Sequence, residues 1–263
     1  MSALFFLACA AVGAFAGFLG GLLGIGGGVV MVPALLLLSD ALGVFPSQPM
    51  LYALGTSLAV IVFTSLSAAR AQVRAGKVRW DIARRWAPGL VLGALAASSV
   101  AVAVPGWSMR AFVGLFLLGV ACVMLTRWQP HPTRTLPGVF GAAVMSSGAG
   151  LVSGMAGIGG GNVIVPTLVY HNVPIHNATA TSSALGVPVA LAGALGYAAY
   201  GGWTPVSLGY VHLPAAVALA LTAVIFAPLG VRVAHRLDAN RLKRYFGMLL
   251  IVVALRMLWS SAL

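Results

Sequence analysis

Acidic side chains are nearly missing from this sequence of 263 residues, in which aspartate and glutamate together number three. These are Asp40, Asp81 and Asp238, and each lies between apolar segments rather than within one. A carboxylate pair for acid–base catalysis, a carboxylate proton relay and a sodium site of the usual kind all need acids that the apolar segments do not provide. The sequence therefore favours functions that do not depend on membrane-embedded carboxylates.

Cysteine is also scarce, because the chain contains two, Cys9 and Cys122. Both lie inside apolar segments with no CxxC spacing, so we expect packing residues rather than a disulfide or a metal site. The histidines show no metal-ligand spacing, and HExxH, GxSxG and GK[ST] are absent, while the GIGGG runs do not complete a GxGxxG. We therefore expect no enzyme, no cofactor and no bound metal.

Charged residues make up 7% of the chain, against roughly 25% in soluble globular domains. Hydrophobic residues make up 60%, and the mean hydropathy is +1.03. This composition predicts an integral membrane protein, surrounded by a lipid bilayer. The net charge of +12 does not indicate nucleic acid as a partner, because the basic residues lie in connections between apolar segments, as expected of loop charge that sets membrane topology.

Glycine is abundant, and one glycine-rich segment occurs twice. GGLLGIGGGVVMVPALL at 20–36 recurs as SGMAGIGGGNVIVPTLV at 153–169, with 10 of 17 positions identical at an offset of 133. Glycine clusters in membrane helices commonly form packing surfaces. However, three consecutive glycines are a poor sequence for a continuous helix, and here they occur in two aligned copies, each followed by a proline. The repeat favours a functional break in the helix.

Each half of the chain is predicted to contain a broken hairpin followed by three membrane spans. In residues 1–129 the hairpin covers about 3–38 and the spans about 50–69, 86–104 and 111–126, and in residues 130–263 the hairpin covers about 137–170 and the spans about 178–199, 211–229 and 245–262. About ten apolar residues follow each glycine run, enough for about 15 Å of helix. Each second arm is therefore expected to reach about half-way through the membrane.

The basic residues predict the orientation, because Arg and Lys collect in short cytoplasmic loops. Six of the fifteen lie in 70–85, two in 127–136 and five in 230–244. If all three loops are cytoplasmic, each glycine hairpin must begin and end on one side, and each half makes three net crossings. The predicted fold is an all-α integral membrane protein of two inverted repeats, each a glycine-broken hairpin followed by three transmembrane helices. Inverted repeats with broken helices are typical of transporters.

A helix that breaks inside the membrane leaves backbone groups unpaired, so the break must line a protein-enclosed or wet cavity. The half-helices predicted to start near Gly28 and Gly161 present free N–H groups and the positive end of the helix dipole. Because glycine also allows a ligand to approach the backbone closely, the expected ligand is a small anion. Pro33 and Pro166 are expected at about the end of the first turn, where a missing N–H costs little.

A second pair of motifs opens the span after each hairpin. ALGTSL at 53–58 and ATATSS at 178–183 align one Thr-Ser pair with the other. These hydroxyls could donate to an oxyanion, with bonds to carbonyls of their own helix as the alternative. The predicted substrate-binding residues are Gly24, Gly26, Gly27, Gly28, Thr56, Ser57, Gly157, Gly159, Gly160, Gly161, Asn162, Thr181 and Ser182.

The doubled glycine hairpin with its proline, the Thr-Ser pair that follows and the length of the chain together resemble the sulfite exporter TauE/SafE family of membrane permeases. The resemblance covers nearly the whole chain. It implies transport of sulfite or an organosulfonate such as sulfoacetate across the bacterial inner membrane. No residue in the sequence identifies the particular anion.

Three modes of transport remain open. Uncoupled export needs no carboxylate, because an inside-negative potential favours expulsion of an anion by about 2.3 kcal/mol per charge per 100 mV. Proton-coupled uptake would use His171 or His176 near the second half-helix, and an anion channel would need a continuous wet pore. The oligomeric state is also open, with a homodimer as one alternative.

Overall fold

The computed structural model describes residues 3–23, 27–45, 47–126, 135–234 and 239–262. These residues form ten helices and one small two-stranded antiparallel sheet. The helices are α1 (Ala3–Leu23), α2 (Gly28–Leu42), α3 (Pro49–Arg74), α4 (Trp80–Ala103), α5 (Gly106–Leu125), α6 (Val139–Ala156), α7 (Gly161–Tyr170), α8 (Ile175–Ala199), α9 (Leu213–Ala234) and α10 (Ala239–Ala262), and the strands are β1 (Ser207–Leu208) and β2 (Val211–His212).

Eight of these helices are long and apolar enough to cross a membrane, which confirms the predicted all-α integral membrane protein. The two that fall short are α2, with 15 residues, and α7, with 10, and each begins where a glycine run ends. The helix therefore breaks at both predicted places. The second arm α7 has the predicted length of about 15 Å, whereas α2 is longer, at about 22 Å by the rise of a helix.

Glycine is required at both breaks by the backbone conformation. Gly27 and Gly160, which precede α2 and α7, have φ angles of 73° and 84°. Gly157, which ends α6, has a φ of 68°. These angles lie in the left-handed region, which costs a residue with a Cβ about 1–2 kcal/mol. Both copies of GIGGG therefore supply glycine at positions where the backbone is left-handed.

The two prolines lie deeper in their helices than expected. Pro33 and Pro166 are each the sixth residue of a short helix, not at the end of the first turn. At that position proline removes the N–H donor for the carbonyl four residues earlier, which belongs to Val29 in α2 and Asn162 in α7. The expectation that the missing donors cost little was therefore wrong, because they belong to the interior ladder of each helix.

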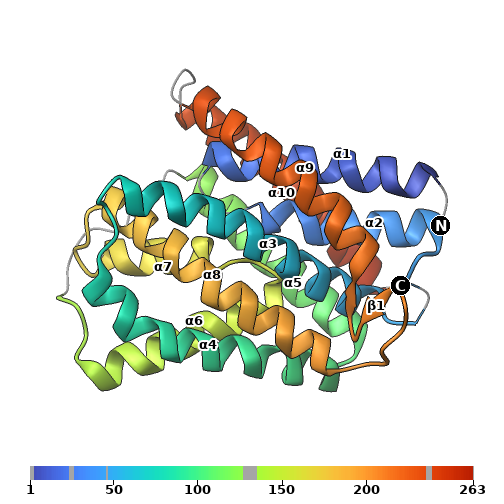
Figure 1. Cartoon of the computed structure of the whole chain (residues 1–263), viewed down its shortest axis with the longest axis horizontal. Helices are drawn as coiled ribbons and strands as arrows, with labels where there is room; N and C mark the ends of the chain where they lie inside the picture. The colour runs from blue at the N-terminus through green and yellow to red at the C-terminus, as the bar shows by residue number, and fades with distance from the viewer. Residues whose placement is uncertain (1–2, 24–26, 46, 127–134, 235–238, 263) are drawn as a thin grey trace.

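Helices α3 and α8 form the centre of the molecule. They are packed against each other and are the most buried of the eight long helices, at 67% and 56% of the spanning window. In Figure 1 they run between α1 and α9 on one side and α4 and α6 on the other. The Thr-Ser motifs lie in the N-terminal parts of these two helices. The motifs are therefore in the central pair of helices.

The most extensive packing joins helices from different halves of the chain, α1 with α9 and α4 with α6. Both interfaces depend on a glycine that has no room for a side chain. A Cβ at Gly17 would collide with the backbone of Ala223, and one at Gly150 would collide with the backbone of Leu90. The two contacts are related by the sequence offset of 133 at both partners. Small residues, which allow two backbones to approach closely, are common at the interfaces between membrane helices.

The buried apolar side chains divide into two clusters. The larger cluster is centred on α1, α2, α3, α5, α9 and α10, and the smaller is centred on α4, α6, α7 and α8. The division does not follow the middle of the sequence, because α4 packs with helices of the second half, and α9 and α10 with helices of the first. The boundary between the clusters is where the candidate site lies.

Candidate functional site

A cavity of about 450 Å³ lies between the two clusters. Residues of α1, α3 and α9 form one wall, and residues of the second glycine break and α8 form the other. The lining side chains that can form hydrogen bonds are Thr64, Ser65, Ser67, Gln72, Thr179, Ser182, Ser183 and Arg232. Among the described residues that line the cavity, Arg232 carries the one charge and none has a carboxylate.

The hydroxyls of the cavity wall differ in whether they are already bonded. Thr64, Thr179 and Ser183 donate to carbonyl oxygens of their own helices, three or four residues earlier, at 2.9–3.2 Å. Ser182 Oγ, in contrast, is buried and has no hydrogen-bond partner among the described residues. The hydroxyl of Ser65, which is 6% exposed, also forms no hydrogen bond within the described part of the chain. Two buried hydroxyls are therefore free to bind a ligand.

The second glycine break adds backbone donors to this wall. Helix α7 starts at Gly161, which lines the cavity, and no side chain caps it. The N–H groups of Gly161 and Asn162 have no backbone acceptor in the described residues, where the first bonds of the helix run from Val163 and Ile164 to Gly160. The Asn162 side-chain nitrogen is likewise buried and unpartnered among the described residues, although Asn162 follows the wall residue Gly161 and does not itself line the cavity. Unpaired donors at the positive end of a helix favour an anion.

The first glycine break contacts the second one directly and is tightly packed. A Cβ at Gly28 would lie 3.0 Å from the carbonyl oxygen of Gly157, and one at Gly27 would lie 2.6 Å from the carbonyl oxygen of Ala16. Gly27 and Gly28 are not among the residues that line the cavity. Gly24 and Gly26 lie outside the described residues. The two breaks thus meet, as the repeat suggested, but the described cavity opens at the second.

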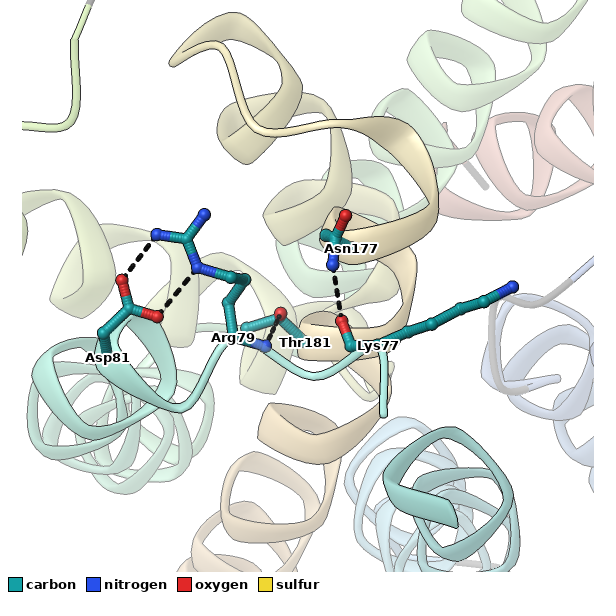
Figure 2. Close-up of polar contacts among 5 residues, drawn as sticks. All are labelled: Lys77, Arg79, Asp81, Asn177 and Thr181. Carbon is teal, nitrogen blue, oxygen red and sulfur yellow. Dashed lines mark hydrogen bonds and ion pairs between the residues drawn. The ribbon is translucent and has the colours of Figure 1, made fainter. Parts of the chain in front are cut away.

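The threonines of the two Thr-Ser motifs are engaged with the backbone. Thr56 Oγ1 accepts a hydrogen bond from the His212 backbone N–H at 3.0 Å, and Thr181 Oγ1 accepts one from the Arg79 backbone N–H, also at 3.0 Å. Figure 2 shows the second of these bonds, beside the bond from Asn177 to the Lys77 carbonyl. The first residues of α9 and α4 follow these donors. Neither threonine lines the cavity.

Ser57, which follows Thr56 in the motif, has one O–H that is shared between two carbonyl oxygens, that of Leu54 at 2.8 Å and that of Gly157 at 3.0 Å. It is fully buried and does not line the cavity. Of the four hydroxyls in the two aligned Thr-Ser pairs, the structure places one, Ser182, in the cavity wall with Gly159 and Gly161. Gly160 adjoins them as the left-handed residue before α7.

The two histidines that could couple transport to protons lie elsewhere. His171 is buried at the end of α7, where its Nδ1 lies 2.8 Å from the Thr167 carbonyl oxygen. His176 is exposed in the first turn of α8. Neither histidine lines the described cavity.

The sequence interpretation predicted three of the lining residues, Gly159, Gly161 and Ser182, and missed the others, among them Ser65 and Arg232. Ser65 lies two turns after Ser57 in α3, so helical spacing would have placed it on the same side of the helix. Its hydroxyl approaches the second break, since a Cβ at Gly159 would lie 3.4 Å from Ser65 Oγ. Arg232 in the last turn of α9 was counted with the basic loop charge, and only the three-dimensional packing brings it to the cavity.

The eight helices long and apolar enough to cross a membrane define a multi-pass membrane protein, and the comparisons with known proteins identify its class as membrane transporters. The family model of the sulfite exporter TauE/SafE matches residues 9–257. A Haemophilus influenzae protein is 34% identical over 96% of this chain and 98% of its own length. A Xylella fastidiosa protein is 30% identical over 95% and 93%, and one from Methanocaldococcus jannaschii is 26% identical over 94% and 93%.

All three relatives carry the name "Probable membrane transporter protein". No solved structure matches this chain significantly. The chain belongs to the sulfite exporter TauE/SafE family.

Proposed function

We propose that this protein is a permease for a small sulfur-containing anion, sulfite or an organosulfonate, and that it exports the anion from the cytoplasm. The observation that carries the proposal is the buried, unpaired hydroxyl of Ser182 in the cavity where α7 presents its free N–H groups. An unsatisfied buried hydroxyl costs about 1–3 kcal/mol, and an oxyanion would satisfy it.

The proposed binding residues surround the second break. Gly161 and Asn162 offer N–H donors at the start of α7, while Ser182 and Ser65 offer hydroxyls from the two walls. Arg232 lies at the end of α9 and is exposed, so it attracts anions toward the cavity without being buried with them. Every one of these groups is a donor or a cation, and this supports an anionic substrate.

We infer the direction of transport from the position of the cavity relative to the basic segments. The cavity reaches Gln72 and Arg232, in the last turns of α3 and α9, and these helices lead into the basic segments 70–85 and 230–244. If those segments are cytoplasmic, this conformation is open to the cytoplasm of a bacterial inner membrane. An anion that enters there is driven outward by the membrane potential, with no coupling ion.

An inverted relation of the halves fits the packing. The contacts of α1 with α9 and of α6 with α4 repeat at the offset of 133, and so do the N–H donors at Arg79 and His212 that the two motif threonines accept. We place the pseudo-two-fold axis in the membrane plane, because the basic segments then share one side. Broken helices of inverted repeats that meet near the midplane are a known transporter arrangement.

The test is sulfite flux in proteoliposomes with equal sulfite on both sides and an imposed potassium diffusion potential. Net flux should reverse when the potential is reversed, and a pH gradient at zero potential should drive little movement once sulfite protonation is corrected. Ser182→Ala should reduce the flux at least fivefold, since it removes an unpaired donor. Ser183→Ala is the matched control, because that hydroxyl lines the same wall but is bonded to Thr179.

Two results would favour the alternatives. Accumulation of sulfite against its gradient when the outside is acid, lost in His171→Ala or His176→Ala, would establish proton-coupled uptake. Flux that does not saturate with sulfite concentration would indicate a channel. Equal flux in Ser182→Ala and wild type would remove the proposed site.

A further inference from the structure

Ser57 connects the centre of the first half to the glycine break of the second. Its hydroxyl lies 2.8 Å from the Leu54 carbonyl oxygen in the same helix and 3.0 Å from the Gly157 carbonyl oxygen, 100 positions further along the chain. Gly157 is the left-handed residue that ends α6. A single buried hydroxyl therefore ties α3 to the start of the second break.

The second break is tightly packed at Gly157, and a few residues later it borders the cavity. A Cβ at Gly157 would lie 2.6 Å from the Val32 side chain, 2.8 Å from that of Leu54 and 2.9 Å from Ser57 Oγ. Gly159 and Gly161, in contrast, line the cavity. One end of the same short segment is packed against α2 and α3 while the other borders the candidate site.

The residue equivalent to Ser57 is in the opposite state of hydrogen bonding. Ser182 occupies the same place in the aligned motif, 125 positions later. Its hydroxyl has no partner among the described residues and lies in the cavity wall. The threonines beside the two serines make equivalent bonds, to the N–H groups of His212 and Arg79. Within the two Thr-Ser pairs, the difference in hydrogen bonding is thus confined to the serines.

The Ser57 bond fixes the start of the second break to the larger apolar cluster. That cluster contains residues of α3 and also Ala156 and Ile158, which flank Gly157, whereas α7 packs in the smaller cluster. The cavity lies where the break passes from one cluster to the other, at Gly159 and Gly161. A movement that closes the cavity by shifting α7 against α3 therefore acts on the segment that the Ser57 bond holds.

We propose that Ser57 is a positioning residue that latches the second break in the state whose cavity opens beside the basic segments. In the opposite state the bond from Ser57 to Gly157 is broken, and Ser57 becomes the free hydroxyl of a cavity on the other side, as Ser182 is here. This inference rests on the proposed transporter function, because it requires two states that alternate.

The experiment measures each state with its own reporter thiol in a background without Cys9 and Cys122. Ser67→Cys reports the described cavity, because Ser67 lies half-buried in its wall and forms no hydrogen bond within the described chain. Ala192→Cys is the equivalent position in α8, 125 residues later, and Ala192 is 5% exposed in this state. Reaction of each purified protein with a small charged thiol reagent is followed without substrate.

The latch predicts a shift between the two reporters. Removing one buried hydrogen bond with Ser57→Ala should raise the reaction rate of Ala192→Cys about fivefold and lower that of Ser67→Cys. Ser57→Thr keeps the hydroxyl and should restore the wild-type rates. Ser183→Ala is the matched control, which should leave the Ala192→Cys rate unchanged because its hydroxyl is bonded only within α8, to the Thr179 carbonyl oxygen.

The latch is overturned if Ser57→Ala leaves the Ala192→Cys rate unchanged, or if Ser183→Ala raises it equally. Should Ser57→Ala not purify as a single species, Ser57→Gly removes the same hydroxyl and is judged in the same way. The result is separable from the test of substrate, since the thiols report movement without sulfite. An Ala192→Cys that never reacts in any variant would overturn the two-state motion itself, even if sulfite binds.

Discussion

His212 holds the start of α9 through two hydrogen bonds. Its backbone N–H donates to Thr56 Oγ1, and its ring Nδ1 accepts the N–H of Ala215 at 3.3 Å. The ring is 5% exposed and packs edge-on against Phe5 and Phe45, at centroid distances of 5.8 and 5.2 Å. Burial lowers the pKa of His212 below its usual value. A neutral ring is therefore part of the folded structure at pH 7.

Stability should accordingly fall with acid. In the unfolded chain a histidine protonates near pH 6.5, and in the folded protein at a lower pH. The stabilising effect of the neutral ring is thus complete above about pH 6.5 and decreases as the pH falls toward the folded pKa, by up to about 1.4 kcal/mol for each unit of difference. The measurement is the thermal unfolding temperature of the purified protein between pH 7 and pH 5.

The His212→Asn variant separates the cap from the titration. Asparagine accepts the N–H at a helix start well but does not titrate, so this variant should lose less stability between pH 7 and pH 5 than the wild type. His176→Asn, at an exposed position, should keep the wild-type slope. Parallel slopes for His212→Asn and wild type would show that another group controls the acid response.

The candidate site shows how far residue patterns alone can be used. The repeat located both breaks and the motif hydroxyls beside them, because backbone conformation and helix position are local properties of the sequence. It could not tell that Ser57 also reaches the second break while Ser182 is free, since this acceptor of Ser57, the Gly157 carbonyl oxygen, lies 100 residues away. Arg232 was missed for the same reason, because its place at the cavity depends on how α9 packs.

At the scale of elements, the interface of α4 with α6 depends on glycines that allow the helices to touch. A Cβ at Gly150 would collide with the Leu90 backbone, whereas one at Gly148 on the same helix would meet nothing within 4 Å. Overpacking a tight interface usually costs about 1–3 kcal/mol. The same substitution in open space removes a glycine from a helix and can stabilise it by up to about 1 kcal/mol.

Gly150→Ala should therefore lower the unfolding temperature by several degrees, at about 3 °C for each kcal/mol. Gly148→Ala, measured in parallel, should leave the unfolding temperature unchanged or raise it. Fluorescence-detected unfolding in detergent makes the comparison. If the two variants behave alike, the close approach of α4 and α6 does not contribute to stability in the way that the packing indicates.

The long helices were predictable as elements because hydropathy over about 20 residues identifies a span. The predicted span 178–199 corresponds to Ile175–Ala199, and 211–229 corresponds to Leu213–Ala234. The small sheet before α9 was not predicted, since two strands of two residues carry no periodicity. The pairing of α1 with α9 could not be predicted from the sequence either, because small residues indicate a packing face of a helix but not which helix packs against it.

At the scale of the whole molecule, charge is distributed unequally between the two ends of the helices. Most basic residues flank the connection from α3 to α4 and the start of α10. Arg110 is an exception near the start of α5, and there it faces Asp40 at 3.9 Å. An exposed tryptophan, Trp203, lies in the connection between α8 and α9, at the opposite end of α9 from Arg232. These features predict which end faces the cytoplasm.

The final prediction is that the two basic segments share the cytoplasmic side. In a background without Cys9 and Cys122, Lys77→Cys and Arg244→Cys should be protected from an impermeant thiol reagent in intact cells and should react after permeabilisation. Trp203→Cys should react in intact cells, because the single helix α9 separates it from Arg244. The physical reason is the retention of short, lysine- and arginine-rich loops in the cytoplasm.

Finding Lys77→Cys and Arg244→Cys on opposite sides would contradict the prediction, because the two halves could not then be inverted with respect to each other. The equivalence of Arg79 with His212 and of Leu90 with Ala223 would in that case be a similarity of packing without a two-fold axis in the membrane plane. Protection of both thiols would place the described cavity on the cytoplasmic side, since its walls end in the helices that lead into these segments. The substrate would then enter from the cytoplasm, as export requires.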